Sequence, residues 1–313
     1  EFWRSLLRIG RIDPLRTMNG AHEAMFETRH VRQLFNRYAT YNGSSPYKTP
    51  ATLNIIPHVE YGLGAFAVDG GIYEIPRALE RRAKELGVVF RYDSPVDRIV
   101  TEGVAGRDAR VAGVQADGEQ LPAQIVVSDV DVKPTYRALL NDPEAPLLKR
   151  YERLEPSSSG LVFYWGVRPG FGELGLHNIF FSSDYEREFR QIFDERVIPD
   201  DPTIYVNITS KVTPSDAPED GENWFVLVNV PSDHGQEWPA EAAALRRRVI
   251  ERLSKELAVD LNERIEAEGL LLPPDIERKT DSHAGSLYGI SSNTLRAAFL
   301  RHPNRSSRYS GLY

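Results

Sequence analysis

The chain has 313 residues, of which 41% are hydrophobic and 27% are charged, and its net charge is −7. This composition is typical of a globular protein with one large core or two smaller ones, and the negative charge argues against a dedicated nucleic-acid binder. The absence of cysteine excludes disulfides and thiolate metal sites and suits a reducing compartment. No apolar run approaches the roughly 18 residues of a membrane-spanning helix.

The N-terminal part of the chain, residues 1–41, is predicted to be mostly helical. Apolar residues recur there at three- and four-residue spacing, with arginines between them. A stretch rich in glycine, serine and proline at 42–50 predicts a turn-rich joint, and a second helix is expected over 51–59. Residues 62–71 are expected to form a loop or a hairpin.

A glycine pair at 70–71 precedes a predicted helix that ends at Gly87, a typical C-cap residue. One face of this helix is apolar, and its residues are Ile75, Leu79 and Leu86. β-branched and aromatic residues then predict short strands over 88–92 and 96–100, separated by a turn at Pro95. This order is typical of one unit of an α/β sandwich.

The next segment is predicted to be a β-hairpin followed by a helix. Its strands cover 110–117 and 119–128, and Asp117-Gly118 lies between them, where a two-residue turn demands positive φ. The helix is expected over 134–140.

Residues 156–285 are predicted to form a second domain of strands and helices. Strands are expected at 159–167, 204–210 and 223–230, and the last is so continuously apolar that it suggests a sheet covered on both sides. Asp184 can cap one helix, and Pro239 can open a longer one with leucine and valine every four residues.

Most local motifs have a structural interpretation. The sequence GLGAFA at 62–67 nearly fits a dinucleotide-binding fingerprint, but it lacks the preceding strand and the following helix. The histidines have no spacing typical of metal ligands, so no metal site is expected. His58 and Glu60 form a His/acid pair close in sequence; a pair of this kind in a strand or a loop more often has a structural role than a catalytic one. No nucleophile-elbow motif is present.

Several separate motifs resemble the carotenoid desaturase family of FAD-dependent oxidoreductases. The run RYATYNGSSPY at 37–47 is similar to a substrate-domain stretch of that family, and PVDRI at 95–99 is similar to the strand that passes the FAD adenine. Residues 285–289 and 299–306 resemble the stretch before the family's C-terminal flavin segment. Four further stretches look like the branch that acts on hydroxylated carotenoids, the 1-hydroxycarotenoid 3,4-desaturases; they cover 159–167, 176–182, 201–211 and 216–231.

The resemblance implies an α/β fold with two functional parts. A partial Rossmann-like FAD-binding domain of the amine-oxidase type is expected beside a substrate domain with a mixed sheet and helices. Residues 1–65 are assigned to the helical part of the substrate domain and 66–142 to the second half of the FAD-binding domain. Residues 143–285 are assigned to the substrate sheet and its helices, and 286–313 return toward the FAD-binding domain.

The resemblance also implies site residues. Val96 is expected to contact the FAD adenine through its backbone, with Gly70, Gly71 and Tyr288 as further cofactor contacts. Glu60 is the candidate general base, because a proton must leave the carbon beside the one that loses a hydride. Candidate substrate contacts are Arg37, Tyr38, Tyr41, Phe163, Trp165, His177, Asn178 and Asn207. The aromatic residues 163–165, 180–181 and 224–225 either line a tunnel for the polyene or fill an ordinary core.

The sequence therefore predicts part of an FAD-dependent carotenoid desaturase, in a cytoplasmic bacterial protein that works at a membrane surface without spanning it. A phytoene desaturase is the alternative within the family. A flavin-free lipid carrier of the GDP-dissociation-inhibitor type is the alternative outside it. The glycine fingerprint and the closing glycine-rich segment of the family are not in this sequence, so we expect an internal piece of a longer protein that alone binds FAD poorly.

Overall fold

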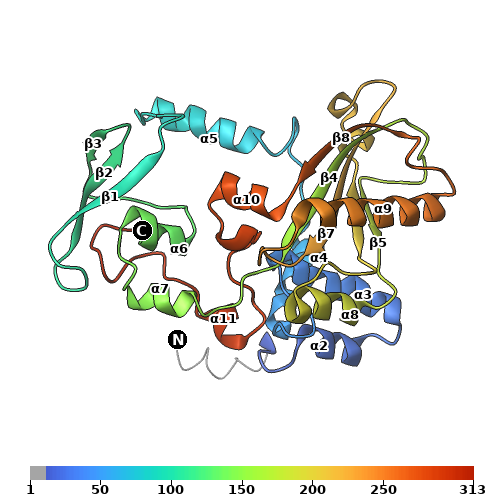
Figure 1. The fold of residues 1–313 in the computed structure, drawn as a ribbon, viewed down its shortest axis with the longest axis horizontal. Helices are drawn as coiled ribbons and strands as arrows, with labels where there is room; N and C mark the ends of the chain where they lie inside the picture. The colour runs from blue at the N-terminus through green and yellow to red at the C-terminus, as the bar shows by residue number, and fades with distance from the viewer. Residues whose placement is uncertain (1–11) are drawn as a thin grey trace. The chain divides into compact units, whose positions relative to one another are not determined.

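The computed structural model describes residues 12–313, and the chain divides into two compact units (Figure 1). Unit 1 consists of Glu1–Pro57 and Glu155–Phe299, and unit 2 of His58–Leu154 and Leu300–Tyr313. The boundaries predicted from the sequence lay at 65, 142 and 285, so each differs from the observed one by 8 to 14 residues. The roles assigned to the two parts stay predictions.

Helices dominate the first part of unit 1, as predicted; residues 1–11 lie outside the described residues. The elements are α2 (Met18–Met25), α3 (Arg29–Asn36), η2 (Arg37–Asn42) and η3 (Ala51–Asn54), and α4 (Ile55–Leu63) continues into unit 2. Thr17 caps α2 by accepting a hydrogen bond from Gly20 N. Gly43 ends η2 at a φ of 61°, as the predicted turn requires.

The centre of unit 1 is a five-stranded sheet in the order β5-β6-β7-β4-β8. Its strands are β4 (Ser159–Val167), β5 (His177–Phe180), β6 (Ile204–Asn207), β7 (Glu222–Val230) and β8 (Ile265–Leu271). Every neighbouring pair is antiparallel, so the prediction of a mixed sheet is wrong. The long helix after β7 crosses over to the edge strand β8, so β7 and β8 run in the same direction, but β4 lies between them and pairs antiparallel with both.

That helix, α9 (Trp238–Leu257), covers one face of the sheet (Figure 1). Its residues Leu245, Val249 and Leu253 are fully buried in the same hydrophobic core as the inward side chains of β4, β6 and β7. The opposite face is only partly covered in the described residues, because burial alternates along β7, where Phe225 and Leu227 remain partly exposed. The expectation of a sheet covered on both sides is therefore met only in part.

Short helices and turns complete unit 1. They are α8 (Tyr185–Arg190), η5 (Gln191–Glu195), η6 (Thr209–Lys211), η7 (Pro214–Asp216), α10 (Pro273–Thr280), η8 (His283–Gly285) and α11 (Leu295–Phe299). Asp184 caps α8 as predicted, since its side chain accepts a hydrogen bond from Arg187 N at 3.0 Å. Pro239 lies in the first turn of α9, also as predicted.

Unit 2 contains a three-stranded antiparallel sheet of β1 (Val96–Glu102), β2 (Arg110–Ala116) and β3 (Glu119–Pro122). The hairpin prediction is confirmed, with φ of 54° at Asp117 and 75° at Gly118. The sheet packs on α6 (Val132–Pro134), η4 (Thr135–Leu139) and α7 (Pro146–Tyr151). Leu148 of α7 is fully buried in this core, which is why the observed boundary falls after α7.

The helix predicted after the glycine pair is present as α5 (Glu74–Glu85), and Gly87 follows it with a φ of 84°. Its apolar residues, however, are exposed, by 44% at Ile75, 66% at Leu79 and 67% at Leu86. The strand predicted at 88–92 is absent, because no described strand lies beside this segment to complete its hydrogen bonds.

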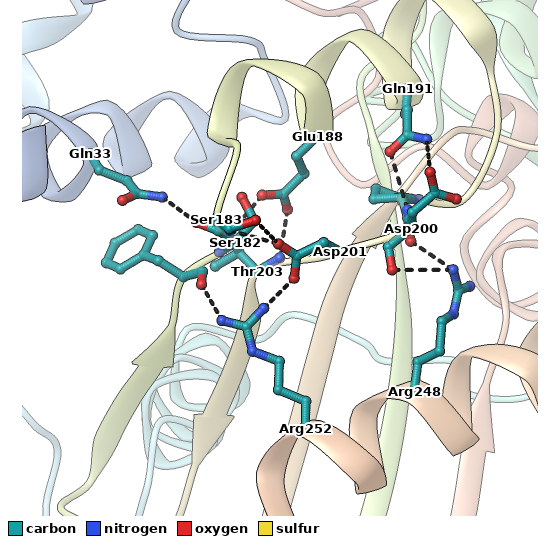
Figure 2. Close-up of polar contacts among 12 residues, drawn as sticks. Gln33, Ser182, Ser183, Glu188, Gln191, Asp200, Asp201, Thr203, Arg248 and Arg252 are labelled. Atoms are coloured by element: carbon teal, nitrogen blue, oxygen red, sulfur yellow. Dashed lines mark hydrogen bonds and ion pairs between the residues drawn. The ribbon is translucent and has the colours of Figure 1, made fainter. Parts of the chain in front are cut away.

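A buried polar network connects four segments of unit 1 (Figure 2). Glu188 of α8 is only 2% exposed, and its carboxylate accepts hydrogen bonds from Thr203 N at 2.9 Å and Thr203 Oγ1 at 2.7 Å. The Thr203 hydroxyl also accepts a hydrogen bond from Ser182 N at 3.1 Å, and Gln33 of α3 donates one to the Ser182 carbonyl at 2.9 Å. This network fixes α3 and α8 to the start of β6.

Two arginines of α9 hold the other side of the same loops (Figure 2). Arg252 bonds the Asp201 carboxylate and the Phe181 carbonyl, and Arg248 donates to the Pro199 carbonyl at 3.1 Å. The segments before β6 and after β5 are thus anchored to a helix that is itself buried along one face.

Burial raises the pKa of Glu188 above its ordinary value of 4.5, although the hydrogen bonds from Thr203 oppose the shift. The folded protein therefore holds a proton that the unfolded chain releases, and stability is lost as the pH rises above 4.5 toward the folded pKa. We predict that Glu188→Gln, which keeps a carbonyl acceptor for Thr203, removes this loss. The melting temperature of the variant relative to that of wild type should therefore rise as the pH increases above 4.5.

The matched control is Glu186→Gln on the same helix, where the side chain is exposed. It should leave the pH dependence of the melting temperature as in wild type. If Glu188→Gln also left that dependence unchanged, the buried carboxyl would carry no such linkage.

Candidate functional site

The candidate site is the partly open face of the five-stranded sheet in unit 1. Side chains alternate along a strand, so Tyr164, Phe225 and Tyr205 lie on the face opposite the α9 core. The rings of Tyr164 and Phe225 meet edge to face at 5.6 Å, and those of Tyr205 and Phe225 do so at 6.4 Å. Tyr164 is 46% exposed. This aromatic surface suits a long apolar ligand.

A polar cluster around His177 borders this aromatic surface. His177 Nδ1 lies 2.7 Å from the Tyr205 hydroxyl and 3.2 Å from Asn207 Nδ2. The same Asn207 nitrogen donates to the Leu176 carbonyl at 3.0 Å, which fixes the amide orientation. Because Asn207 Nδ2 can only donate, His177 Nδ1 is an acceptor, and Nε2 carries the proton. The exposed histidine therefore offers one N–H donor at the margin of the aromatic face.

Arg37 closes another end of the face. It is 9% exposed, and its Nη1 donates to Asn229 Oδ1 at 2.8 Å. Asn229 follows Phe225 and Leu227 on the same side of β7. No ion pair of Arg37 occurs within the described residues, yet its charge acts on the buried Glu188 carboxyl and lowers the raised pKa of that group. The arginine places a buried positive charge beside the aromatic surface.

Burial raises the pKa of Tyr205, and the nearby Arg37 charge and the Asn207 hydrogen bond reduce the shift. The tyrosine hydroxyl is therefore protonated at neutral pH and donates to His177 Nδ1. The face thus combines aromatic rings with hydroxyl, imidazole and guanidinium donors, which can orient an oxygen on an otherwise apolar molecule.

The other predicted substrate residues are placed differently. Phe163 and Trp165 are buried in the α9 core with their rings stacked at 5.3 Å, on the side of the sheet opposite Tyr164. Asn178 stabilises its own loop through hydrogen bonds to Gly175 N and O. Tyr38 packs in a small core with Met18, and Tyr41 is 53% exposed with its ring 5.2 Å from that of Tyr38. The predicted substrate roles of these residues are not tested by their positions.

The residues predicted to contact a cofactor lie in both units. In unit 2, Val96 begins β1 and is 41% exposed, and the backbone of Gly70 and Gly71 has φ of 82° and 91°. A Cβ added at Gly71 would meet no atom within 4 Å, so open space lies beside that backbone. In unit 1, Tyr288 is 47% exposed, and its ring lies against Gly43, where an added Cβ would approach it to 2.8 Å.

Glu60, the predicted base, lies on α4, and His58 lies two residues before it on the same helix, on a different side. The expectation that this pair occupies a strand or a loop is wrong, because Pro57 is tolerated in the first turn of a helix. In residues 12–313 no three His, Cys, Asp or Glu side chains are grouped so as to hold a metal ion. Among those residues, no helix is long and apolar enough to cross a membrane.

The sequence analysis missed Glu188, Thr203 and Asn229. The sequence did contain a signal for a buried acid at Glu188. Residues 185, 188, 189 and 192 share one helical face, and the acid at 188 interrupts an otherwise apolar stripe. Nothing in the local sequence marks Asn229 as the partner of Arg37, since the two lie 192 residues apart.

No family model matches the chain. It is 43% identical over 288 residues to a 1-hydroxycarotenoid 3,4-desaturase of Flavobacterium sp. (strain P99-3), which covers 92% of the chain and 58% of that relative. It is 35% identical to a 4,4'-diapolycopene oxygenase of Methylomonas sp, over 100% of the chain and 62% of the relative. A zeta-carotene-forming phytoene desaturase of Myxococcus xanthus is 36% identical, over 99% of the chain and 59% of the relative.

Solved structures show the same fold. An oxidoreductase from Methanosarcina mazei matches 99% of the chain and 65% of its own length, with a TM-score of 0.60 and 15% identity. A putrescine oxidase variant made in a redesign of cofactor binding matches 97% of the chain and 62% of its own length, with a TM-score of 0.55 and 13% identity. The chain thus spans about three fifths of the length of the curated relatives. The predicted resemblance is confirmed: the chain is a relative of the carotenoid desaturases and oxygenases.

Proposed function

We propose that the protein containing this chain is an FAD-dependent carotenoid desaturase of the 1-hydroxycarotenoid 3,4-desaturase type. The main support is the 43% identity to such an enzyme over 92% of the chain, against 36% to the phytoene desaturase and 35% to the oxygenase. The aromatic face with its polar margin supports the same substrate class, because a hydroxylated polyene is a long apolar chain with one oxygen.

A carotenoid offers almost no charge for recognition, so its binding free energy has to come from apolar burial, at about 25 cal/mol per Å². Tyr164, Phe225 and Leu227 supply partly exposed apolar area on one side of the sheet. Arg37 and His177 supply donors at its margins, where an end-group oxygen can accept a hydrogen bond. These residues would bind and orient the substrate.

FAD fits the residues proposed to hold it. Open space beside Gly71 and the exposed start of β1 at Val96 leave room for a planar group and a close backbone approach. Gly70 of the same unit is a further proposed contact. When bound, FAD would accept the hydride that the substrate carbon loses on desaturation.

The second hydrogen leaves as a proton, and Glu60 remains the proposed acceptor. We predict that Glu60→Gln in the complete protein lowers kcat about 100-fold while the flavin content and KM stay near those of wild type. Turnover of the variant and the wild type, normalised to bound flavin, checks this. Unchanged turnover would remove Glu60 from the mechanism.

The substrate is membrane-soluble, so we also propose that the protein works at a membrane surface on the cytoplasmic side.

We predict that the complete protein, purified with flavin, removes two hydrogens from a 1-hydroxycarotenoid at least tenfold faster than from its non-hydroxylated counterpart. Product mass and absorbance measure both reactions.

Equal or faster turnover of phytoene would favour the phytoene desaturase alternative, and a product that gains oxygen would favour an oxygenase. A complete protein that binds the lipid but no flavin would support the carrier alternative instead.

A further inference from the structure

Unit 1 contains a polar pocket of about 380 Å³ that is separate from the aromatic face of the sheet. It lies between α2, α3 and the start of α8, and none of its lining residues belongs to a strand. Its volume is in the range of small-molecule sites. Amides and hydroxyls form much of its wall, from Asn19, Gln33, Asn36, Tyr47, Ser183 and Tyr185.

Charged side chains of both signs also line the pocket, and they form no ion pairs with one another in the described residues. Arg29 and Arg32 contribute from α3, while Glu23 contributes from α2 and Asp184 and Glu186 from the start of α8. No ion pair between these arginines and these carboxylates is formed within residues 12–313. Arg32 donates from Nη2 to the Glu27 carbonyl at 2.9 Å, and its buried Nε has no hydrogen-bond partner there.

Carboxylates of the pocket act on the hydroxyl of Tyr47, which also lines it. Burial is the main cause that raises the pKa of the Tyr47 hydroxyl, and Glu186, Asp184 and Glu188 raise it further in that order. The ring of Tyr47 is held against Phe189, with 6.2 Å between centroids. A tyrosine face next to carboxylates is a favourable environment for an ammonium group.

We propose that this pocket binds a zwitterion with a phosphate and an ammonium group, with the phosphate on Arg29 and Arg32 and the ammonium beside Tyr47 and Glu186. Two arginines suit the phosphate, because guanidinium groups make charge-assisted hydrogen bonds to phosphate oxygens. The carboxylates disfavour a ligand that carries only negative charge, and the arginines disfavour one that carries only positive charge. Phosphoethanolamine and phosphocholine have the required chemistry, either as phospholipid headgroups or as free molecules.

The test measures binding of the full chain to three probes: vesicles of phosphatidylethanolamine and phosphatidylcholine, vesicles that contain phosphatidylglycerol, and soluble phosphocholine. We expect preference for the zwitterionic vesicles. Arg29→Gln combined with Arg32→Gln should weaken that binding about tenfold or more. The matched control, Arg81→Gln combined with Arg247→Gln, removes the same charge from exposed positions outside the pocket and should bind like wild type.

A second variant tests the acidic wall of the pocket. Its result can be interpreted even if the arginine double variant fails to fold. Glu23→Gln combined with Glu186→Gln should shift the preference toward phosphatidylglycerol vesicles. Binding of soluble phosphocholine without binding of zwitterionic vesicles would assign the pocket to a free zwitterion. The proposal fails if no zwitterionic probe binds, if the arginine pair and its control behave alike, or if wild type prefers phosphatidylglycerol.

Discussion

The structure of unit 1 depends on the unequal burial of the two faces of its central sheet. The α9 helix covers one face, and Leu245 and Leu253 are buried there with the inward side chains of β4 and β7. Because strand side chains alternate, every side chain that points away from α9 lies on the other face of the sheet. Tyr164 and Phe225 therefore form an aromatic surface on that face, and Arg37 lies at the end of this surface, where it bonds Asn229. The proposed substrate contacts are consequences of how the core is packed.

Polar contacts then hold the elements around this sheet in place. Glu188 is buried without an ion pair in the described residues, so its hydrogen bonds to Thr203 are the contacts that make its burial tolerable. On the outer side, Arg252 ties the same loops to α9 through Asp201. Rigid loops at this end of the sheet keep α3 and α8 together, and these are the helices that form the wall of the polar pocket.

Much of this fold was predictable because its signals are local. The spacing of leucine and valine located α9, and Asp117-Gly118 located a hairpin whose turn needs positive φ. The strand expected at 159–167 has the observed bounds. Predictions failed where distant partners decide the outcome: a strand at 88–92 needs a neighbour to pair with, and the apolar face of α5 is exposed in the described residues.

The site was predictable only in part for a related reason. Every residue from 161 to 165 is apolar or aromatic, so period two separates Tyr164 from Phe163 and Trp165 without showing which set faces the core. The packing of α9 decides this, and it buries Phe163 and Trp165. His177 was predicted as a substrate contact, and that role stays a prediction; its contact with Tyr205 depends on the pairing of β5 with β6, which the local sequence does not show.

The central claim is that the polyene lies on the face opposite α9, and photo-crosslinking tests it most directly. A photoreactive 1-hydroxycarotenoid analogue would be bound to the complete protein and irradiated, and the labelled peptides identified by mass spectrometry. The account predicts adducts on Tyr164, Phe225 and their neighbours on that face, suppressed by unlabelled substrate. Competable labelling confined to α9 or to segments away from the sheet would contradict it.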